Sequence, residues 1–209
     1  MLALGFDTSL QACSVALWRD GAVLARRSEC MARGHAEALL PMIVAVMADG
    51  GAAWRDLTLI GVTVGPGTFT GIRIGLAAAR GLGLAAGLPV AGVGTADAVA
   101  AGVASDDPRP LIVALDAKRA ELFVRIGSNP IEALTPEAVA ARFPGPARLA
   151  GDAAWRLAAL MPRAELVAAG PPDAGVVAAL AAARWLDGTA LPARPLYLRA
   201  PDVHVPGPP

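Results

Sequence analysis

The stretch Val64–Gly75, VGPGTFTGIRIG, joins an aliphatic run to an alanine-rich run. The run that leads into it, LTLIGVTV at residues 57–64, is rich in β-branched residues, which is typical of a strand buried on both faces. The residues from about Thr70 to Ala86 predict a helix. Glycines between a strand and a helix often bind phosphate, because the free N–H groups at a helix N-terminus attract anions. The stretch is therefore either an anion site or a turn whose glycines satisfy a geometric need.

The common phosphate-binding motifs do not match this turn. A Walker A loop needs a lysine directly after its last glycine, and this chain has no lysine before Lys118. The dinucleotide fingerprint needs its third glycine three residues after the second, whereas Gly67 is followed by Gly71. A phosphate or a carboxylate could still bind at this turn, through its backbone N–H groups, its two threonines and Arg73. Both interpretations, ligand binding and tight backbone geometry, stay open.

The helix after this turn has small residues along one face. They recur at every fourth position, as Gly71, Gly75, Ala79 and Gly83. Residues at that spacing share a face, and a helical glycine costs about 1 kcal/mol relative to alanine, so the pattern predicts a backbone approaching closely. The preceding helix, GHAEALLPMIVAVMADGG, is apolar at nearly every position and leaves no clean solvent face. We expect a second polypeptide to cover both helices; burial of both inside the monomer is the alternative.

Composition excludes several classes of protein. The chain has 209 residues, 55% of them hydrophobic, which suits one domain or two small ones. Its 18 basic residues balance 18 acidic ones, and a protein that binds RNA alone usually has a basic surface. Any RNA contact is therefore expected from a partner. Two cysteines make no disulfide framework, the N-terminus does not resemble a signal peptide, and no apolar stretch spans a membrane. We predict a cytoplasmic protein.

The pattern of elements suggests two lobes. Three strands are expected between Leu2 and Glu29, then the two helices, then a strand at 89–94 and a helix opened by Thr95 as its N-cap. The segment SDDPRP reads as a linker. We therefore predict an N-terminal lobe of residues 1–104 and a C-terminal lobe of residues 105–209, with an extended tail at 192–209.

The second half begins like the first. LIVALDAKRAELFVRIG and LALGFDTSLQACSVALW both run from an aliphatic strand through an aspartate and a polar turn to a second strand. Asp7 and Asp116 therefore hold equivalent positions in a weak internal repeat. Together they could hold Mg²⁺ and phosphate between two lobes, or each could simply form a turn at a strand end.

Histidine gives little catalytic potential. The chain has His35 and His204 alone. A helical zinc pair that starts at His35 would need a second histidine at position 39, which is Leu39. We expect neither a metal site nor a catalytic triad.

Several segments together resemble the TsaB (YeaZ) family. They are GFDTSLQACSVALW, GHAEALLPMI, GPGTFTGIRIGLAAARGLG, GVGT, LDAKRAELF and PLYLR. The resemblance covers nearly the whole chain and is most specific at the glycine turn. It implies an α/β, two-lobed actin-like or sugar-kinase-like (ASKHA) fold with mixed sheets flanked by helices. It also implies a non-catalytic subunit in the formation of threonylcarbamoyladenosine on tRNA.

The family resemblance also implies partners. It implies pairing with the catalytic paralogue TsaD, docking of the ATPase TsaE on that pair, and a homodimer in isolation. The chain would need no cofactor of its own, because ATP and metal would belong to the partner subunits, and tRNA would be bound only through the complex. The chain departs from some members at its end, where APDVHVPGPP replaces a basic tail.

Two groups of site residues follow from these arguments. The expected partner interface comprises His35, Leu39, Leu40, Ile43, Met47, Gly71, Arg73, Gly75, Ala79 and Gly83. A vestigial nucleotide or phosphate site would comprise Asp7, Thr8, Ser9, Gly65, Gly67, Thr68 and Asp116. No catalytic and no metal-ligating residue is expected. The alternatives are an ATP-binding, kinase-like enzyme of the same fold that uses the second group, and a homodimeric binding module.

Overall fold

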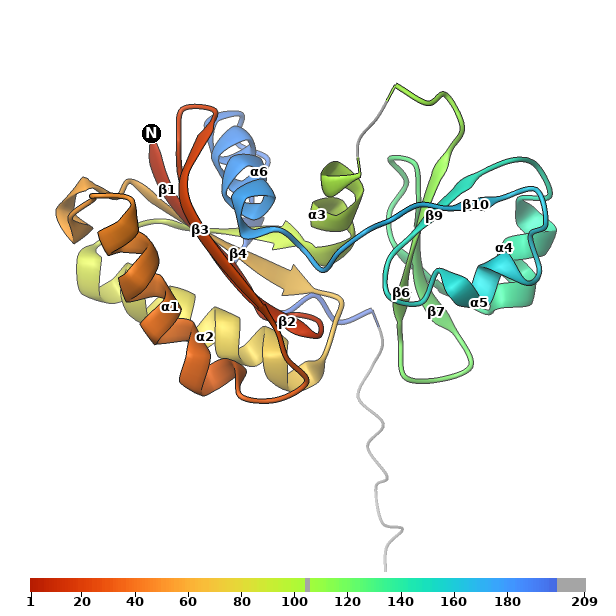
Figure 1. Ribbon diagram of the computed structural model, residues 1–209, viewed down its shortest axis with the longest axis horizontal. Helices are drawn as coiled ribbons and strands as arrows, with labels where there is room; N and C mark the ends of the chain where they lie inside the picture. The colour runs from red at the N-terminus through yellow and green to blue at the C-terminus, as the bar shows by residue number, and fades with distance from the viewer. Residues whose placement is uncertain (104–105, 199–209) are drawn as a thin grey trace, which may run out of the picture.

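Two β-sheets, one in each lobe, organise the chain (Figure 1). The structure is a computed structural model that describes residues 1–103 and 106–198. The first sheet has the order β11-β5-β4-β1-β2-β3. Its strands are β1 (Leu2–Asp7), β2 (Ala12–Arg19), β3 (Ala22–Cys30), β4 (Leu59–Gly65), β5 (Val90–Gly94) and β11 (Leu191–Pro192). The second sheet has the order β10-β9-β6-β7-β8. Its strands are β6 (Leu111–Asp116), β7 (Leu122–Ile126), β8 (Glu132–Leu134), β9 (Arg148–Ala150) and β10 (Glu165–Leu166).

Helices cover both faces of the first sheet. The helices of the chain are α1 (His35–Asp49), the 3₁₀ turn η1 (Trp54–Asp56), α2 (Phe69–Ala86), α3 (Thr95–Gly102), α4 (Pro136–Arg142), α5 (Trp155–Ala158) and α6 (Ala174–Leu186). In Figure 1, α1 and α2 lie together on one face of the first sheet and α6 on the other. Every residue of β1 and β4 is buried as a result, as expected of central strands in a sheet covered on both faces. The predicted α/β fold with mixed, helix-flanked sheets is confirmed.

Both sheets mix parallel and antiparallel pairs. β1 pairs antiparallel with β2 and parallel with β4, and β4 pairs parallel with β5. In the second sheet, β6 pairs antiparallel with β7 and parallel with β9. The two sheets thus share the strand–turn–strand unit that the sequence repeat predicts, with Asp7 and Asp116 each ending the first strand of its unit.

The first lobe takes in part of the predicted second lobe. The boundary predicted between residues 104 and 105 falls outside the described residues. The division assigned residues 105–209 to the C-terminal lobe, but α6 packs on β1 and β4, and β11 pairs with β5. Of the predicted tail, residues 192–198 lie beside the first sheet, where the N–H of Leu196 donates to the carbonyl of Val64 at 2.8 Å; residues 199–209 lie outside the described part.

Glycines in the strands explain this placement of α6. A Cβ on Gly5 would lie 2.4 Å from the carbonyl oxygen of Ala174, and one on Gly61 would lie 2.7 Å from the Cβ of Ala181. The helix therefore approaches the sheet more closely than any larger residue at these two strand positions would permit. Sequence distance alone did not indicate that this segment returns to the first lobe.

The small-residue face of α2 packs inside the chain. Gly71, Gly75, Ala79 and Gly83 are all buried. A Cβ on Gly71 would lie 2.0 Å from the carbonyl oxygen of Thr8, and one on Gly75 would lie 2.6 Å from Thr8 Oγ1. The prediction that these four residues receive a partner helix is therefore wrong. The close neighbour is the chain's own β1–β2 turn and sheet, which is the alternative of burial inside the monomer.

Two further findings concern the helices. Gly94, not Thr95, is the N-cap of α3, and the Thr95 hydroxyl is buried without a hydrogen-bond partner among the described residues. In the described part of the chain, no helix combines the length and apolarity needed to cross a membrane.

Replacing Gly71 with alanine tests the close seat of α2. The Gly71→Ala variant is expected to lose about 1–3 kcal/mol of unfolding free energy, because the added methyl meets a backbone carbonyl that cannot move away cheaply. Gly81→Ala, on the same helix, is the matched control, because a Cβ there meets nothing within 4 Å. This control should gain about 0.5–1 kcal/mol. Urea denaturation of both variants measures the difference, and equal stabilities would contradict the packing described.

Candidate functional site

The β1–β2 turn and the glycine turn form a closed, hydrogen-bonded unit. The carboxylate of Asp7 is fully buried, and its Oδ1 accepts from the Ser9 N–H at 3.1 Å, the Ser9 hydroxyl at 2.5 Å and the Thr63 hydroxyl at 2.6 Å. Its Oδ2 has no hydrogen-bond partner among the described residues. The Thr68 N–H donates to the carbonyl of Ser9 at 2.7 Å. The predicted phosphate-site residues of this region are thus brought together, but they bond to one another.

Burial governs the charge of Asp7. Loss of solvent raises the pKa of this carboxyl, and the hydrogen bonds from Ser9 and Thr63, with the nearby His35, only partly oppose that rise. Ionisation of Asp7 is therefore unfavourable in the folded chain. Asp7, Thr8 and Ser9 are at most 1% exposed, so none of them offers an oxygen to solvent as an Mg²⁺ site requires.

The glycine turn meets a geometric need. Gly65 has a φ of 111°, a conformation that favours glycine. A Cβ on Gly67 would lie 2.4 Å from the carbonyl oxygen of Ser9. The hydroxyl of Thr68 caps α2 by accepting from the N–H of Gly71 at 3.3 Å. Of the two interpretations of this turn, the structure supports tight backbone geometry.

Asp116 lies in a different environment from Asp7. It lines a cavity of ≈ 490 Å³ together with Asp152, Lys118 and Trp155. Its carboxylate accepts from the backbone N–H and the ammonium of Lys118, both at 2.7 Å. Burial alone would raise the pKa of Asp116, but the bonds to Lys118 outweigh burial and lower it. Asp7 does not line this cavity, so the predicted Asp7–Asp116 pair does not form. In residues 1–103 and 106–198, no three side chains of His, Cys, Asp or Glu gather as a metal site would require.

Most of the predicted interface residues are in the core. The buried ones are His35, Leu39, Ile43, Met47, Gly71, Gly75, Ala79 and Gly83, which leaves Leu40 and Arg73 exposed. His35 is not a surface contact: its Nε2 donates to the carbonyl of Leu10 at 3.1 Å and so ties the start of α1 to the β1–β2 turn. The prediction of an interface at these eight residues is corrected, because the chain's own first sheet and β1–β2 turn cover them.

A different surface is exposed on the same two helices. We define the outer helix face as Leu40, Val44, Ala77, Gly81 and Leu84, all of which face solvent. The exposed fractions of Leu40, Val44 and Leu84 are 51%, 61% and 88%. These residues recur at spacings of three and four, so each set follows one helical stripe. Sequence analysis found Leu40 but missed the other four, because it took the small-residue stripe as the outward one.

An aromatic and arginine cluster lies beside the start of α2. The guanidinium of Arg73 lies 3.5 Å above the ring centroid of Phe69, and its Nη2 donates to the Tyr197 hydroxyl at 3.3 Å. The rings of Phe69 and Tyr197 stack with centroids 6.5 Å apart. Both aromatic residues are more than half exposed. They are distant in sequence, and no local pattern indicated this contact.

Comparison with known proteins identifies the family. A sequence model described as "TsaD: tRNA N6-adenosine threonylcarbamoyltransferase" matches residues 28–161. An uncharacterised Mycobacterium tuberculosis protein is 38% identical over 203 residues, covering 95% of this chain and 92% of that protein. The structure named YeaZ from Pseudomonas aeruginosa superposes with a TM-score of 0.80 at 30% identity, covering 94% of this chain and 99% of that one. The chain belongs to the TsaB (YeaZ) family. The Escherichia coli protein named "tRNA threonylcarbamoyladenosine biosynthesis protein TsaB" is 39% identical over 124 residues, which is 59% of this chain and 53% of that protein.

The Asp7→Asn variant tests the buried carboxyl. A carboxyl whose pKa is raised on folding lowers stability as pH rises from its unfolded value of 3.8 through the folded value, because the folded state holds the proton longer. Asparagine keeps the Oδ1 acceptor but cannot ionise. We therefore expect the variant to be more stable than the parent at neutral pH, with its advantage disappearing toward about pH 4.

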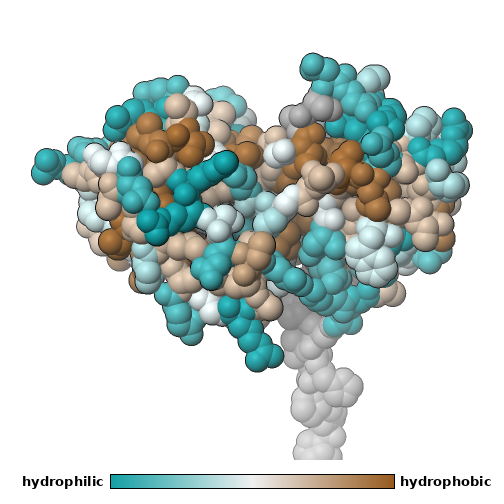
Figure 2. All heavy atoms as spheres, in the orientation of Figure 1, coloured by the Kyte–Doolittle hydropathy of each residue, from teal (hydrophilic) through white to brown (hydrophobic). Residues whose placement is uncertain are grey.

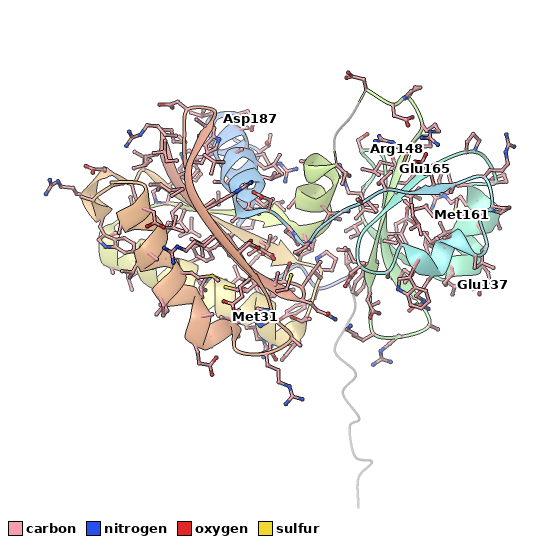
Figure 3. All side chains as sticks on the ribbon, viewed as in Figure 1. Met31, Glu137, Arg148, Met161, Glu165 and Asp187 are labelled. Carbon is pink, nitrogen blue, oxygen red and sulfur yellow. The ribbon has the colours of Figure 1, made fainter. Side chains whose placement is uncertain are left out.

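The control for this prediction is a carboxyl with the opposite shift. Asp187 follows α6 (Figure 3), and hydrogen bonds from Thr189 lower its pKa. Asp187→Asn should therefore lose a little stability above about pH 4 instead of gaining any. Urea denaturation between about pH 4 and pH 8 measures both variants. A stability loss for Asp7→Asn that is the same at every pH would show that ionisation of Asp7 is not disfavoured.

Proposed function

We propose that this TsaB-family chain is a non-catalytic subunit in the formation of threonylcarbamoyladenosine on tRNA, and that it pairs with a TsaD-type subunit through the outer helix face. The names of its relatives support the pathway. The match to the transferase family model includes α1 and α2 and supports a partner of related fold.

The observation that carries the pairing is the exposure of apolar side chains on α1 and α2. Leu40, Val44 and Leu84 project from helices whose other faces are already buried against the sheet. Burying such a side chain gives roughly 1.5–3 kcal/mol, so three of them could drive a stable contact. Ala77 and Gly81, which are also exposed on α2, carry little side-chain bulk, so a partner helix could approach closely there. Figure 2 shows that hydrophobic residues also lie on the surface of both lobes elsewhere, so the test needs a control outside α1 and α2.

The arrangement of the two aspartates supports a non-catalytic role. The Oδ1 atom of Asp7 accepts hydrogen bonds from three donors within the chain, and the carboxylate of Asp116 is paired with Lys118. In this proposal ATP, metal and the transfer chemistry belong to the partner subunits. The formal net charge of zero supports binding of tRNA through the complex, since a protein that binds RNA by itself usually has a basic surface. The ATPase TsaE would dock on the assembled pair, and the same outer face would form a homodimer when the chain is alone, because a two-fold contact uses one patch twice.

Charged substitutions on the outer helix face test the pairing. Leu40→Asp and Val44→Asp should each weaken binding to the TsaD subunit by about tenfold or more, because a buried carboxylate would replace an apolar contact. The unfolding midpoint should stay near that of the parent, since both side chains are exposed. Leu166→Asp is the control, because Leu166 on β10 is 50% exposed, close to the value for Leu40. Titration calorimetry with purified TsaD and sedimentation of the chain alone measure the two contacts. Unchanged affinity in both α1 variants would place the interface elsewhere.

A kinase-like function is the second candidate, and the ≈ 490 Å³ cavity at Asp116, Lys118 and Trp155 favours it. The scaffold proposal predicts no heat above dilution when Mg-ATP, up to about 1 mM, is titrated into the chain alone. Magnesium-dependent binding that Lys118→Ala removes, while Arg142→Ala on the second lobe does not, would favour the kinase-like function.

A further inference from the structure

A second cavity between the lobes is separate from the Asp116 cavity and from the outer helix face. It has a volume of ≈ 450 Å³, within the range of small-molecule sites. Its walls come from both lobes: the glycine turn at Gly65, the start of α3, the end of β7 and the loop after it, and α6 with the segment that follows. Of the residues predicted for a phosphate site, only Gly65 lies in this lining, and the sequence did not single out the arginines or Asp97.

Two arginines and one aspartate form the polar side of this cavity. Arg125 on β7 contacts Asp97 Oδ1 through Nε at 3.0 Å, and Arg184 on α6 contacts Asp97 Oδ2 through Nη2 at 2.8 Å. The three side chains are only 20–25% exposed. Gly94 leaves space for this carboxylate, since a Cβ there would lie 3.0 Å from Asp97 Oδ2. Asp97 therefore holds two guanidinium groups from different lobes beside one cavity.

The charges of this group do not balance. One carboxylate neutralises one guanidinium, and Asp97 is the sole acidic residue among the described residues that line the cavity. Each guanidinium has five N–H donors in a planar fork that suits carboxylate and phosphate oxygens. In its ion pair with Asp97, each arginine makes the contact through one nitrogen. Ser128 and Asn129 add side-chain donors at the same cavity. The polar side is therefore complementary to an anion.

The same cavity also has an apolar part to its lining. Pro66, Ile131, Leu191 and Leu196 belong to it. A free inorganic anion would gain nothing from these residues, whereas an anion attached to an apolar or planar body would bury that body against them. The lining thus favours an organic anion over a simple ion.

We propose that this interlobe cavity binds a small organic anion, a phosphate or a carboxylate, with its oxygens on Arg125 and Arg184 and its body against the apolar lining residues. The site lies on this chain alone. It does not depend on the proposed pairing with TsaD, so either proposal can fail without the other.

The full chain can be titrated calorimetrically with four probes. Phenyl phosphate and benzoate carry both features, phenol carries only the apolar body, and inorganic phosphate carries only the charge. We expect phenyl phosphate, benzoate or both to bind about tenfold or more tightly than phenol and inorganic phosphate, and the stronger of the two identifies the anion. If neither binds with a dissociation constant below about 1 mM, the proposal is overturned.

Substitutions assign the binding to the arginine pair. Arg125→Gln and Arg184→Gln should each reduce the affinity for the more tightly bound probe by about tenfold or more. Arg142→Gln is the matched control, because Arg142 pairs with Glu132 on the surface of the second lobe and does not line the cavity. Binding by both cavity variants with the parent's affinity would overturn the proposal.

A variant that leaves the ion pairs intact covers the case in which the arginine variants do not fold. Ser128 is exposed at the cavity, so Ser128→Trp should fill its mouth without disturbing Asp97. This variant should also reduce the affinity for the more tightly bound probe by about tenfold, and its unfolding midpoint should stay near that of the parent. Unchanged binding in Ser128→Trp would place the probe outside the cavity and reject the site.

Discussion

The close approach of α2 to the β1–β2 turn fixes the first lobe. Gly67 and Gly71 bring the backbone of the glycine turn and of α2 against the carbonyl oxygens of Ser9 and Thr8, at distances that no Cβ would permit. The Thr8 hydroxyl then donates to the carbonyl of Gly71 at 2.7 Å. These contacts hold α2 close to the β1–β2 turn, so its small-residue face is buried and its opposite face is exposed to solvent. The exposure of Leu84 on α2, one of the apolar residues on which the proposed function rests, is a consequence of this contact.

The same approach explains why Asp7 is buried. A turn pressed under a helix has no solvent beside it, so the Asp7 carboxyl depends on Ser9 and Thr63 for hydrogen bonds. The sequence repeat suggested that Asp7 could, together with Asp116, hold Mg²⁺ and phosphate. Here burial raises the pKa of Asp7, whereas Asp116, at the equivalent place in the second lobe, keeps contact with a cavity. The two halves of the internal repeat therefore share the strand–turn–strand topology, but their aspartates lie in different environments.

Local patterns were sufficient for most elements of the fold. Extended apolar patterns, or glycine and proline at the ends, mark the strands β1 to β5 and the helices α1 and α2. Each of these elements was predicted near its observed position. The segment that forms α6 was assigned to the C-terminal lobe, because periodicity contains no information about which sheet a helix covers. The stripe of Gly71, Gly75, Ala79 and Gly83 was found for a sound reason, close backbone approach, but a sheet and a partner helix require the same small residues. Spacing shows which residues share a face and does not show whether that face points inward.

The segment after α6 links surfaces that the sequence keeps apart. Arg184 near the end of α6 pairs with Asp97, which also pairs with Arg125, at the interlobe cavity, and Leu196 lies in the wall of the same cavity. One residue further on, Tyr197 accepts a hydrogen bond from Arg73 on the exposed side of α2, and the carbonyl of Ala193 accepts one from Arg80 a further two turns along that helix. The segment is therefore held between α2 and the cavity by contacts on both sides. Its proline-rich composition suits this role, because proline restricts φ and reduces the entropy lost when an extended segment is fixed. A chain end that reads as an irregular tail in the sequence is, up to Leu198, a structural part of the first lobe.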